Sequence, residues 1–392
     1  MEAYLDNSAT TRVAKEVTEI VIQVMEKDFG NPSSKHMKGV ESERYIKAAA
    51  RIIAGILKAD EKEIVFTSGG TESNNLALIG CAMANRRAGN HIITTAIEHP
   101  SVSEPLKYLE SEGFRLTCLP VDGDGRISLE ELKESITPDT IMVSTIFVNN
   151  ETGAVQDVAA IGGLISRINP AVIYHVDAVQ AFGKYEIYPS KMNIDLLSVS
   201  AHKFHGPKGA GFLYINNKVK IRPLMLGGGQ QRGRRSGTDN VPGAAGLGKA
   251  AELAYARLAK NTARMRELKE YLTSQLEAIN DELKPICPIF NIKINSRTEG
   301  APHIVSASFS PIKSEVLLNA LAEKGIYASA GSACSLSKPK LSGTLRAIGL
   351  SAEEADCTLR FSLCKDTCRE EIDYTLSALK ELLPVLSSFV AR

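Results

Sequence analysis

Two apolar runs in the sequence each lead to a side chain that could act on a small organic substrate. Lys203 follows the run 196–200, and a partly buried lysine loses its proton readily enough to attack a carbonyl and form a Schiff base. Asp177 ends the run 172–177, and a carboxylate at a dry sheet edge needs a cationic partner. A protonated pyridine nitrogen would be such a partner, as in pyridoxal phosphate (PLP) enzymes. Taken singly, a surface lysine and a helix-capping or ion-paired aspartate are the ordinary interpretations.

Two further segments follow predicted strands. Ser68-Gly69-Gly70-Thr71 joins a strand to a helix start, where glycines and free backbone N–H groups form a cradle for an anion. The segment lacks the lysine of a Walker loop, and a plain turn is its alternative. His99 could stack on a ring and transfer protons, although a lone histidine is more often structural. Four such strand ends together indicate one site.

Cys334 is the candidate nucleophile. Its segment, 328–343, is rich in small, polar and cationic residues, which predicts an exposed loop. A thiol with a pKa of about 8.5 is only a few per cent ionised near neutrality, and Lys338 and Lys340 could lower that pKa. The alternative for an isolated cysteine is a buried apolar side chain.

The other cysteines number six and are scattered, which does not indicate a disulfide framework. Cys357, Cys364 and Cys368 form no C-x-x-C pair. A zinc site there is weakly indicated, and thiols of a terminal helical segment are the favoured interpretation. We expect no metal site.

Strands and helices alternate through the first two thirds of the chain, which predicts an α/β fold with a mostly parallel sheet of seven strands covered by helices on both faces. The predicted strands are 64–67, 91–97, 115–121, 140–148, 172–177, 196–200 and 211–215, and the predicted helices between them are 72–86, 101–112, 128–135 and 158–169.

The chain beyond residue 248 is predicted to form most of a smaller α+β domain. A single long helix is predicted over 249–283, followed by strands at 304–309 and 326–328 and helices at 314–324, 342–348 and 369–383. We predict a large cofactor domain over 13–258 and a small domain, made of 1–12 and 259–392, that carries the Cys334 segment.

Composition narrows the function classes. The 392 residues include 46 Lys plus Arg and 45 Asp plus Glu, for a net charge of +1, which removes the electrostatic basis for bulk binding of nucleic acid or of an anionic membrane. Residues 1–12 are not expected to act as a signal peptide, and no apolar stretch reaches the ~20 residues of a membrane span. A cytoplasmic location is expected. An RNA-binding module around Arg232-Gly233-Arg234-Arg235 is a remote alternative, because no aromatic residue adjoins it.

Over essentially its whole length the chain resembles cysteine desulfurases of the NifS/IscS type, in the class V aminotransferase group of fold-type I PLP enzymes. The resemblance rests on an ordered set of segments: 4–11 (YLDNSATT), 30–34 (GNPSS), 66–75 (FTSGGTESNN), Glu98-His99, 148–153 (VNNETG), 177–180 (DAVQ), His202-Lys203, 235–238 (RSGT) and 331–334 (GSAC).

The resemblance implies a role for each matching residue. Lys203 would hold PLP as a Schiff base, Asp177 would pair with the ring nitrogen, and His99 would stack on the ring and move protons. The phosphate and ring hydroxyl would be bound by Gly70, Thr71, Gln180, Ser200 and His202, with Thr238 contributed by the other subunit of a homodimer. Asn150 and Arg360 would hold the substrate carboxylate, for which the arginine fork is well suited.

The implied reaction converts L-cysteine to L-alanine and leaves a persulfide on Cys334, which passes the sulfur to an acceptor protein. Selenocysteine lyase and another class V PLP transferase, such as an aminotransferase, are the alternatives. Gly70 stands where many members have Ala, a difference expected to be harmless, and His205 stands where Tyr or Phe is common. The chain ends at Arg392, without the longer tail of IscS proteins, so we expect an iron–sulfur scaffold and a tRNA-thiolation enzyme as comparable acceptors.

Overall fold

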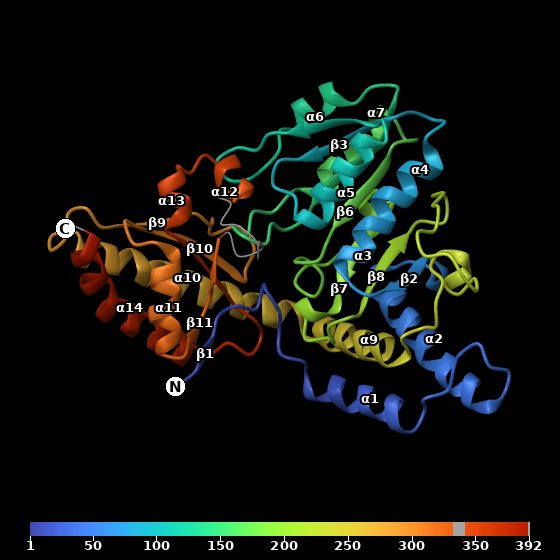
Figure 1. Cartoon of the computed structure of the whole chain (residues 1–392), viewed down its shortest axis with the longest axis horizontal. Helices are drawn as coiled ribbons and strands as arrows, with labels where there is room; N and C mark the ends of the chain where they lie inside the picture. Colours follow the sequence, from blue (N-terminus) through green and yellow to red (C-terminus); the bar gives the residue numbers. More distant parts are fainter. Residues whose placement is uncertain (332–341, 391–392) are drawn as a thin grey trace.

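The computed structural model describes residues 1–331 and 342–390 (Figure 1). Cys334, Lys338 and Lys340 lie outside the described residues.

A seven-stranded sheet forms the larger half of the molecule and confirms the predicted α/β class. Its strands lie in the order β2-β8-β7-β6-β5-β3-β4. All neighbours are parallel except the pairs that include β8. The bounds are β2 Ile64–Thr67, β3 His91–Thr95, β4 Arg115–Leu119, β5 Thr140–Ile146, β6 Ile173–Asp177, β7 Leu196–Ser200 and β8 Gly211–Ile215.

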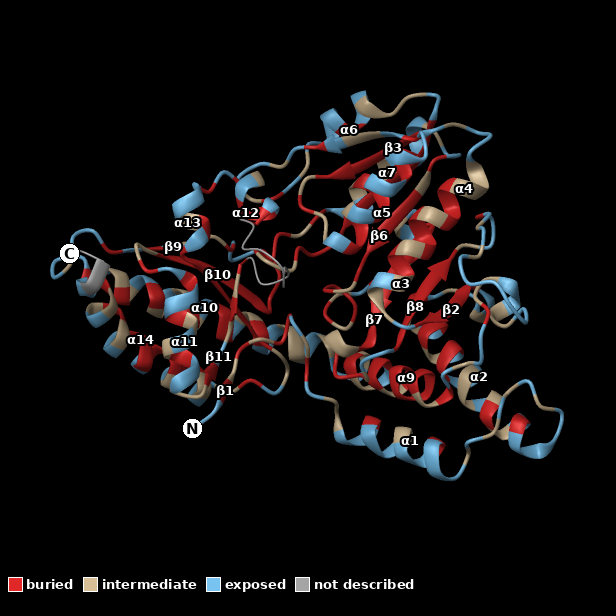
Figure 2. Ribbon diagram, in the orientation of Figure 1, coloured by how far each residue is buried: buried red, intermediate tan, exposed pale blue. Residues whose placement is uncertain are grey.

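Helices cover both faces of this sheet because alternate strand side chains enter two different apolar clusters. Leu197 and Val199 of β7 pack into the cluster shared with α2 (Met37–Leu57), α7 (Val158–Ile168) and α9 (Val241–Ala256). Leu196 packs on the opposite face. That face is covered by α5 (Pro100–Ser111) and by a helical stretch composed of α3 (Gly70–Asn75), a π-helical turn (Leu76–Gly80) and α4 (Cys81–Asn85). Figure 2 shows buried residues along the strands and on the helix faces turned toward them.

The smaller half contains an antiparallel sheet in the order β12-β13-β10-β9. Its apolar cluster includes side chains from β1 and β11 and from three helices, α10, α11 and α14. The bounds are β1 Ala3–Tyr4, β9 Asn291–Ile294, β10 Ile304–Ser310, β11 Ile326–Tyr327, β12 Ser329–Ala330, β13 Thr358–Ser362, α10 Leu258–Leu283, α11 Ser314–Glu323 and α14 Arg369–Val390.

The chain start belongs to this half, because β1 pairs in parallel with β11. Residues 5–12 then cross to the larger half, where α1 (Lys15–Glu26) packs on α9. The remaining short helices are α6 (Leu129–Ser135), α8 (Pro189–Met192), α12 (Gly343–Ala347) and α13 (Ala352–Asp356).

Two sequence-based expectations are wrong. The single helix predicted over 249–283 is divided between α9 and α10, because Arg257 leaves the helical region with φ −132° and ψ 23°. Cys364 and Cys368 are not in a terminal helix but lie between β13 and α14, and Cys357 ends α13. The division into two domains near residue 258 stays a prediction.

Within the described residues, no helix is both long and apolar enough to cross a bilayer.

Candidate active site

Lys203 lies at the carboxyl end of β7, in a short 3-10 turn over Ala201–Lys203. Its Nζ donates hydrogen bonds to the Ser8 carbonyl, at 2.6 Å, and to the Ala9 carbonyl, at 2.8 Å. The amine is thus at the predicted edge of the sheet, and its position depends on the segment that crosses from the smaller half.

Asp177 lies at the carboxyl end of β6, next to β7 in the sheet. Its side chain is buried and accepts hydrogen bonds from the Val179 N–H, at 2.9 Å, and from the Asn74 amide, at 2.8 Å. Both of these hydrogen-bond donors are neutral amides. A buried carboxylate held by neutral donors fits a cationic ring nitrogen.

His99 caps α5 with its side chain. Nδ1 accepts a hydrogen bond from the Ser101 N–H at 3.1 Å, so the ring proton of the neutral form is on Nε2. Burial lowers the pKa of His99; Asp177 acts against this shift and Lys203 adds to it. His99 is thus a mostly neutral imidazole within electrostatic reach of both residues.

A chain of hydrogen bonds connects His99 with Asp177. The sequence analysis did not predict the two residues that form it, Asn74 and Ser101. The Asn74 amide donates to Asp177 and also to the Ser101 hydroxyl, at 2.9 Å, and that hydroxyl lies 2.8 Å from His99 Nδ1. Asn74 is fully buried, and its Oδ1 has no partner among the described residues. Asn74 lies within the quoted segment 66–75 and Ser101 lies two residues after His99, and these positions are the only signal that the sequence offers for them.

The anion cradle forms where the Gly69-Gly70 turn meets Ser200. A Cβ atom at Gly69, whose φ is +151°, would lie 3.5 Å from Ser200 Oγ, and one at Gly70 would lie 3.6 Å from Ser200 Cβ. The Gly70 Cβ would also lie only 2.7 Å from Val179 Cγ2. A Cβ atom at position 70 would therefore require the Val179 side chain to shift. Thr71 is exposed at the start of α3.

Gln180 and His202 approach the same centre from two sides. The Gln180 amide donates to the Ser8 carbonyl at 2.9 Å, the same oxygen that Lys203 uses. His202 Nδ1 lies 3.2 Å from the Thr10 hydroxyl. Burial, with Lys203 and further lysines adding to it, lowers the pKa of His202 to about 4, so the ring is neutral near pH 7.

Arg360, on β13, is brought to the site from the smaller half. It donates to the Asn150 carbonyl and to Asp6 Oδ1, both at 2.8 Å. Its Nε is buried and has no partner among the described residues. The guanidinium therefore keeps donors for a further acceptor, as the binding of a substrate carboxylate requires.

Thr238 is exposed and lies in the loop before α9. Arg235 of the same loop pairs with Glu72 of α3, with Nε and Oε1 2.8 Å apart. The loop is thereby held beside the helix that follows the Gly69-Gly70 turn.

Comparison with known proteins identifies the family. The model of the family described as aminotransferase class-V matches residues 3–375. The chain belongs to this family. It is 44% identical over 384 residues, 98% of this chain and 92% of the relative, to "Cysteine desulfurase IscS" of Methanosarcina thermophila.

Two solved structures resemble the fold of this class V chain. "NIFS-LIKE PROTEIN" superposes with a TM-score of 0.91 and 39% identity, covering 98% of this chain and all of that one. "SspA in complex with cysteine" does so with a TM-score of 0.79 and 35% identity, covering 93% of this chain and all of that one. The comparisons confirm the predicted NifS/IscS-type family, fold and enzyme class. The roles of the individual site residues stay predictions.

Proposed function

We propose that this enzyme is a PLP-dependent cysteine desulfurase whose site is the one built around Lys203. The observation that carries the proposal is the convergence of Lys203 and Asp177, at neighbouring strand ends, with His99 within reach of both. The relatives named cysteine desulfurase support the assignment over nearly the full length.

The residues fit PLP in three respects. Lys203 offers an amine for a Schiff base, and Asp177 offers a buried carboxylate for the ring nitrogen. The turn at Gly69-Gly70, with Ser200, Thr71 and His202, offers hydroxyl and N–H donors to a phosphate. When bound, PLP supplies an electron sink for negative charge at the substrate α-carbon.

The side chains around this group do the remaining work. His99, neutral and with its proton on Nε2, is suited to receive and return a proton. Arg360 and Asn150 are proposed to hold the substrate carboxylate, and Gln180 to bond the ring hydroxyl. Cys334 is proposed to take the sulfur, so that L-cysteine and one thiol give L-alanine and one persulfide.

The decisive experiment compares the purified holoenzyme with Cys334→Ser and with Cys118→Ser, a control that removes an exposed thiol elsewhere in the chain. After treatment with L-cysteine labelled in its sulfur, the parent and the control should release alanine and carry labelled sulfur at Cys334. Cys334→Ser should retain the cofactor absorption and lose both products. Full alanine release by Cys334→Ser would contradict the assignment and would favour a lyase.

Lys203→Ala tests the cofactor side of the proposal. Because no other described lysine occupies the end of β7, the variant should lose the visible absorption of the covalently held cofactor. An unchanged spectrum would show that PLP is held elsewhere.

We further propose a homodimer, to which the second subunit contributes Thr238. Large apolar side chains on and after α1 and in the 220–230 loop support a subunit contact, because Met25, Phe29, Met37 and Leu226 are 62–81% exposed. Phe29→Asp and Leu226→Asp should each shift the mass measured by sedimentation toward the monomer. The sulfur acceptor is proposed to be a separate protein, an iron–sulfur scaffold or a tRNA-thiolation enzyme.

A further inference from the structure

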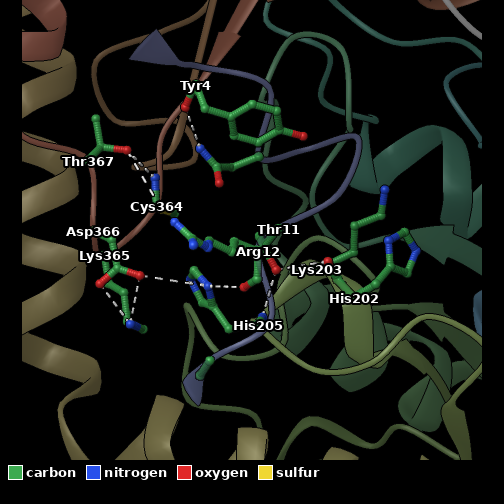
Figure 3. A network of polar contacts seen from close by, with 12 residues as sticks. Tyr4, Thr11, Arg12, His202, Lys203, His205, Cys364, Lys365, Asp366 and Thr367 are labelled. Atoms are coloured by element: carbon green, nitrogen blue, oxygen red, sulfur yellow. Dashed lines mark hydrogen bonds and ion pairs between the residues drawn. The ribbon is translucent and has the colours of Figure 1, made fainter. Parts of the chain in front are cut away.

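Three side chains of metal-ligating types meet beside Thr11 and Arg12, on the side opposite to the side chain of Lys203 (Figure 3). They are His205, two residues beyond Lys203, and Cys364 and Asp366, in the turn that follows β13. One ligand atom from each lies within 4.8 Å of the other two. We propose that these three side chains bind one Zn²⁺-like divalent transition-metal ion. The inference does not depend on the proposed desulfurase activity.

His205 is held in a fixed orientation. Its N–H donates to the Thr11 hydroxyl at 2.7 Å, and its Nδ1 donates to the Arg12 carbonyl at 2.9 Å. Nδ1 is also the ring nitrogen that faces the cluster, 3.9 Å from Asp366 Oδ2. Metal binding at Nδ1 would therefore place the ring proton on Nε2 and replace the hydrogen bond to the Arg12 carbonyl. Burial also lowers the pKa of His205, which keeps the ring neutral as a ligand must be.

Cys364 is presented by a tight turn. Its N–H donates to the Thr367 hydroxyl at 3.0 Å, and that hydroxyl lies 3.7 Å from the Cys364 sulfur and donates to it. The sulfur is mostly buried, and burial raises the pKa of the thiol. Metal binding would therefore form a metal–sulfur bond, break the S–H bond and release the proton to solvent, while backbone N–H groups of the turn stabilise the thiolate.

The charges balance for a dication. A thiolate and a carboxylate supply two negative charges, and a neutral imidazole supplies none. Lys365 now pairs with the Asp366 carboxylate at 2.8 Å, so the metal must take the place of this ammonium. The Asp366 side chain is 64% exposed, which leaves it free to turn from Lys365 toward an ion. Burial lowers the pKa of the adjacent Lys184 to about 7, which reduces its repulsion of a cation.

The donor set selects the class of metal. One sulfur, one imidazole nitrogen and one carboxylate oxygen suit Zn²⁺ or a similar borderline ion. Ca²⁺ and Mg²⁺ require mostly oxygen ligands and are disfavoured. Three protein ligands leave a fourth position for water.

The test measures Zn²⁺ binding to the holoenzyme in a Cys334→Ser background, which removes the other reactive thiol. Equilibrium dialysis should find one ion per chain, and zinc X-ray absorption should show a single sulfur neighbour at about 2.3 Å. Cys364→Ser and His205→Phe should each weaken binding by a factor of about ten or more. Cys368→Ser is the matched control, because it removes a nearby thiol outside the cluster, and it should leave binding unchanged.

Asp366→Asn distinguishes the loss of a zinc ligand from the loss of folding, because changing this exposed side chain should have little effect on the melting temperature. It should weaken zinc binding by several-fold while the melting temperature stays that of the parent. The proposal is overturned if the parent binds no ion, if the bound ion has no sulfur neighbour, or if Cys364→Ser and His205→Phe bind as tightly as the parent.

Discussion

The Ser8 carbonyl oxygen accepts hydrogen bonds from both Lys203 and Gln180. A charged donor to a neutral acceptor is worth more than an ordinary hydrogen bond. This one oxygen therefore aligns the proposed Schiff-base lysine with the proposed partner of the ring hydroxyl. The arrangement ties both residues to Ser8, which is 172 positions from Gln180 and 195 from Lys203 in the sequence.

Gly70 is needed where it is because a side chain there would touch Val179. Gly70→Ala should destabilise the protein by about 1 kcal/mol, since overpacking costs about 1–3 kcal/mol and the better helix propensity of Ala returns part of this. It should also weaken PLP binding, as measured by fluorescence titration.

Two variants control this prediction. Combining Val179→Ala with Gly70→Ala should relieve the close contact and recover the lost stability. Gly55→Ala, in α2, has no atom within 4 Å of the added carbon and should be neutral or stabilising. Equal effects of Gly70→Ala alone and in the pair would show that the contact is not the cause.

Glu98, beside His99, makes stability depend on pH. Burial raises the pKa of Glu98 to about 8, although the Thr95 hydroxyl and the Ile146 N–H donate to it. The folded state therefore keeps a proton that the unfolded state loses above about pH 4.5. This contribution to stability is complete below pH 4.5 and is lost as the pH rises through about 8.

The side chain in Glu98→Gln cannot ionise, so this variant should not lose stability in this way as the pH rises. Between pH 5 and pH 8 its urea midpoint should rise relative to the parent, whereas Glu110→Gln, an exposed control, should follow the parent. Parallel pH profiles for all three proteins would refute the assignment of a protonated Glu98.

At the scale of elements, Asn149 organises the loop that presents Asn150. Its Oδ1 accepts from the Glu151 and Thr152 N–H groups, each at 2.9 Å, and its amide donates to the Ile97 carbonyl at 2.9 Å. Asn149→Ala leaves these buried groups unpaired and should cost about 1–3 kcal/mol per group left without a partner.

Asn149→Asp separates the two halves of this network. It keeps the acceptor and loses the donor, so it should retain the loop and place a carboxylate oxygen against the Ile97 carbonyl. Thermal melts should rank the parent above both variants. If the Asn149→Ala protein were as stable as the parent, water would have replaced the hydrogen bonds of the Asn149 side chain.

The local sequence pattern predicted the strands of the seven-stranded sheet. β2, β7 and β8 have the predicted bounds, and the placement of Asp177 and Lys203 at one edge followed from parallel strands. The break at Arg257 could not be predicted, because neither glycine nor proline marks it. The contacts of Ser8 and Asn74 also could not, because a backbone carbonyl or a buried amide has no sequence signature for a distant partner.

At the scale of the whole molecule, the 5–8 segment joins the two halves through β13. The Ser362 hydroxyl accepts from the Ser8 N–H at 2.8 Å, and the Asn7 amide donates to the Ser362 carbonyl at 2.9 Å. Ser362→Ala should cost about 1–3 kcal/mol, because it leaves a buried N–H unpaired.

The consequence of Ser362→Ala should extend to Lys203, because the Ser8 carbonyl is displaced with its N–H. The rate of Lys203 acylation in the cofactor-free protein should change, as read by peptide mass spectrometry. Ser306→Ala is the matched control: this buried hydroxyl on β10 has no partner among the described residues, and its removal should be neutral or stabilising. Equal unfolding midpoints for the two variants would contradict the role of the Ser8–Ser362 bond.

Because residues 6–8 bond to residues 360–362, the amine of Lys203 acquires its final neighbours only when two segments far apart in the chain have met. Contacts across some 355 positions close late in folding. The pocket that would retain the coenzyme should therefore be completed late, after the apolar clusters of the two halves have formed.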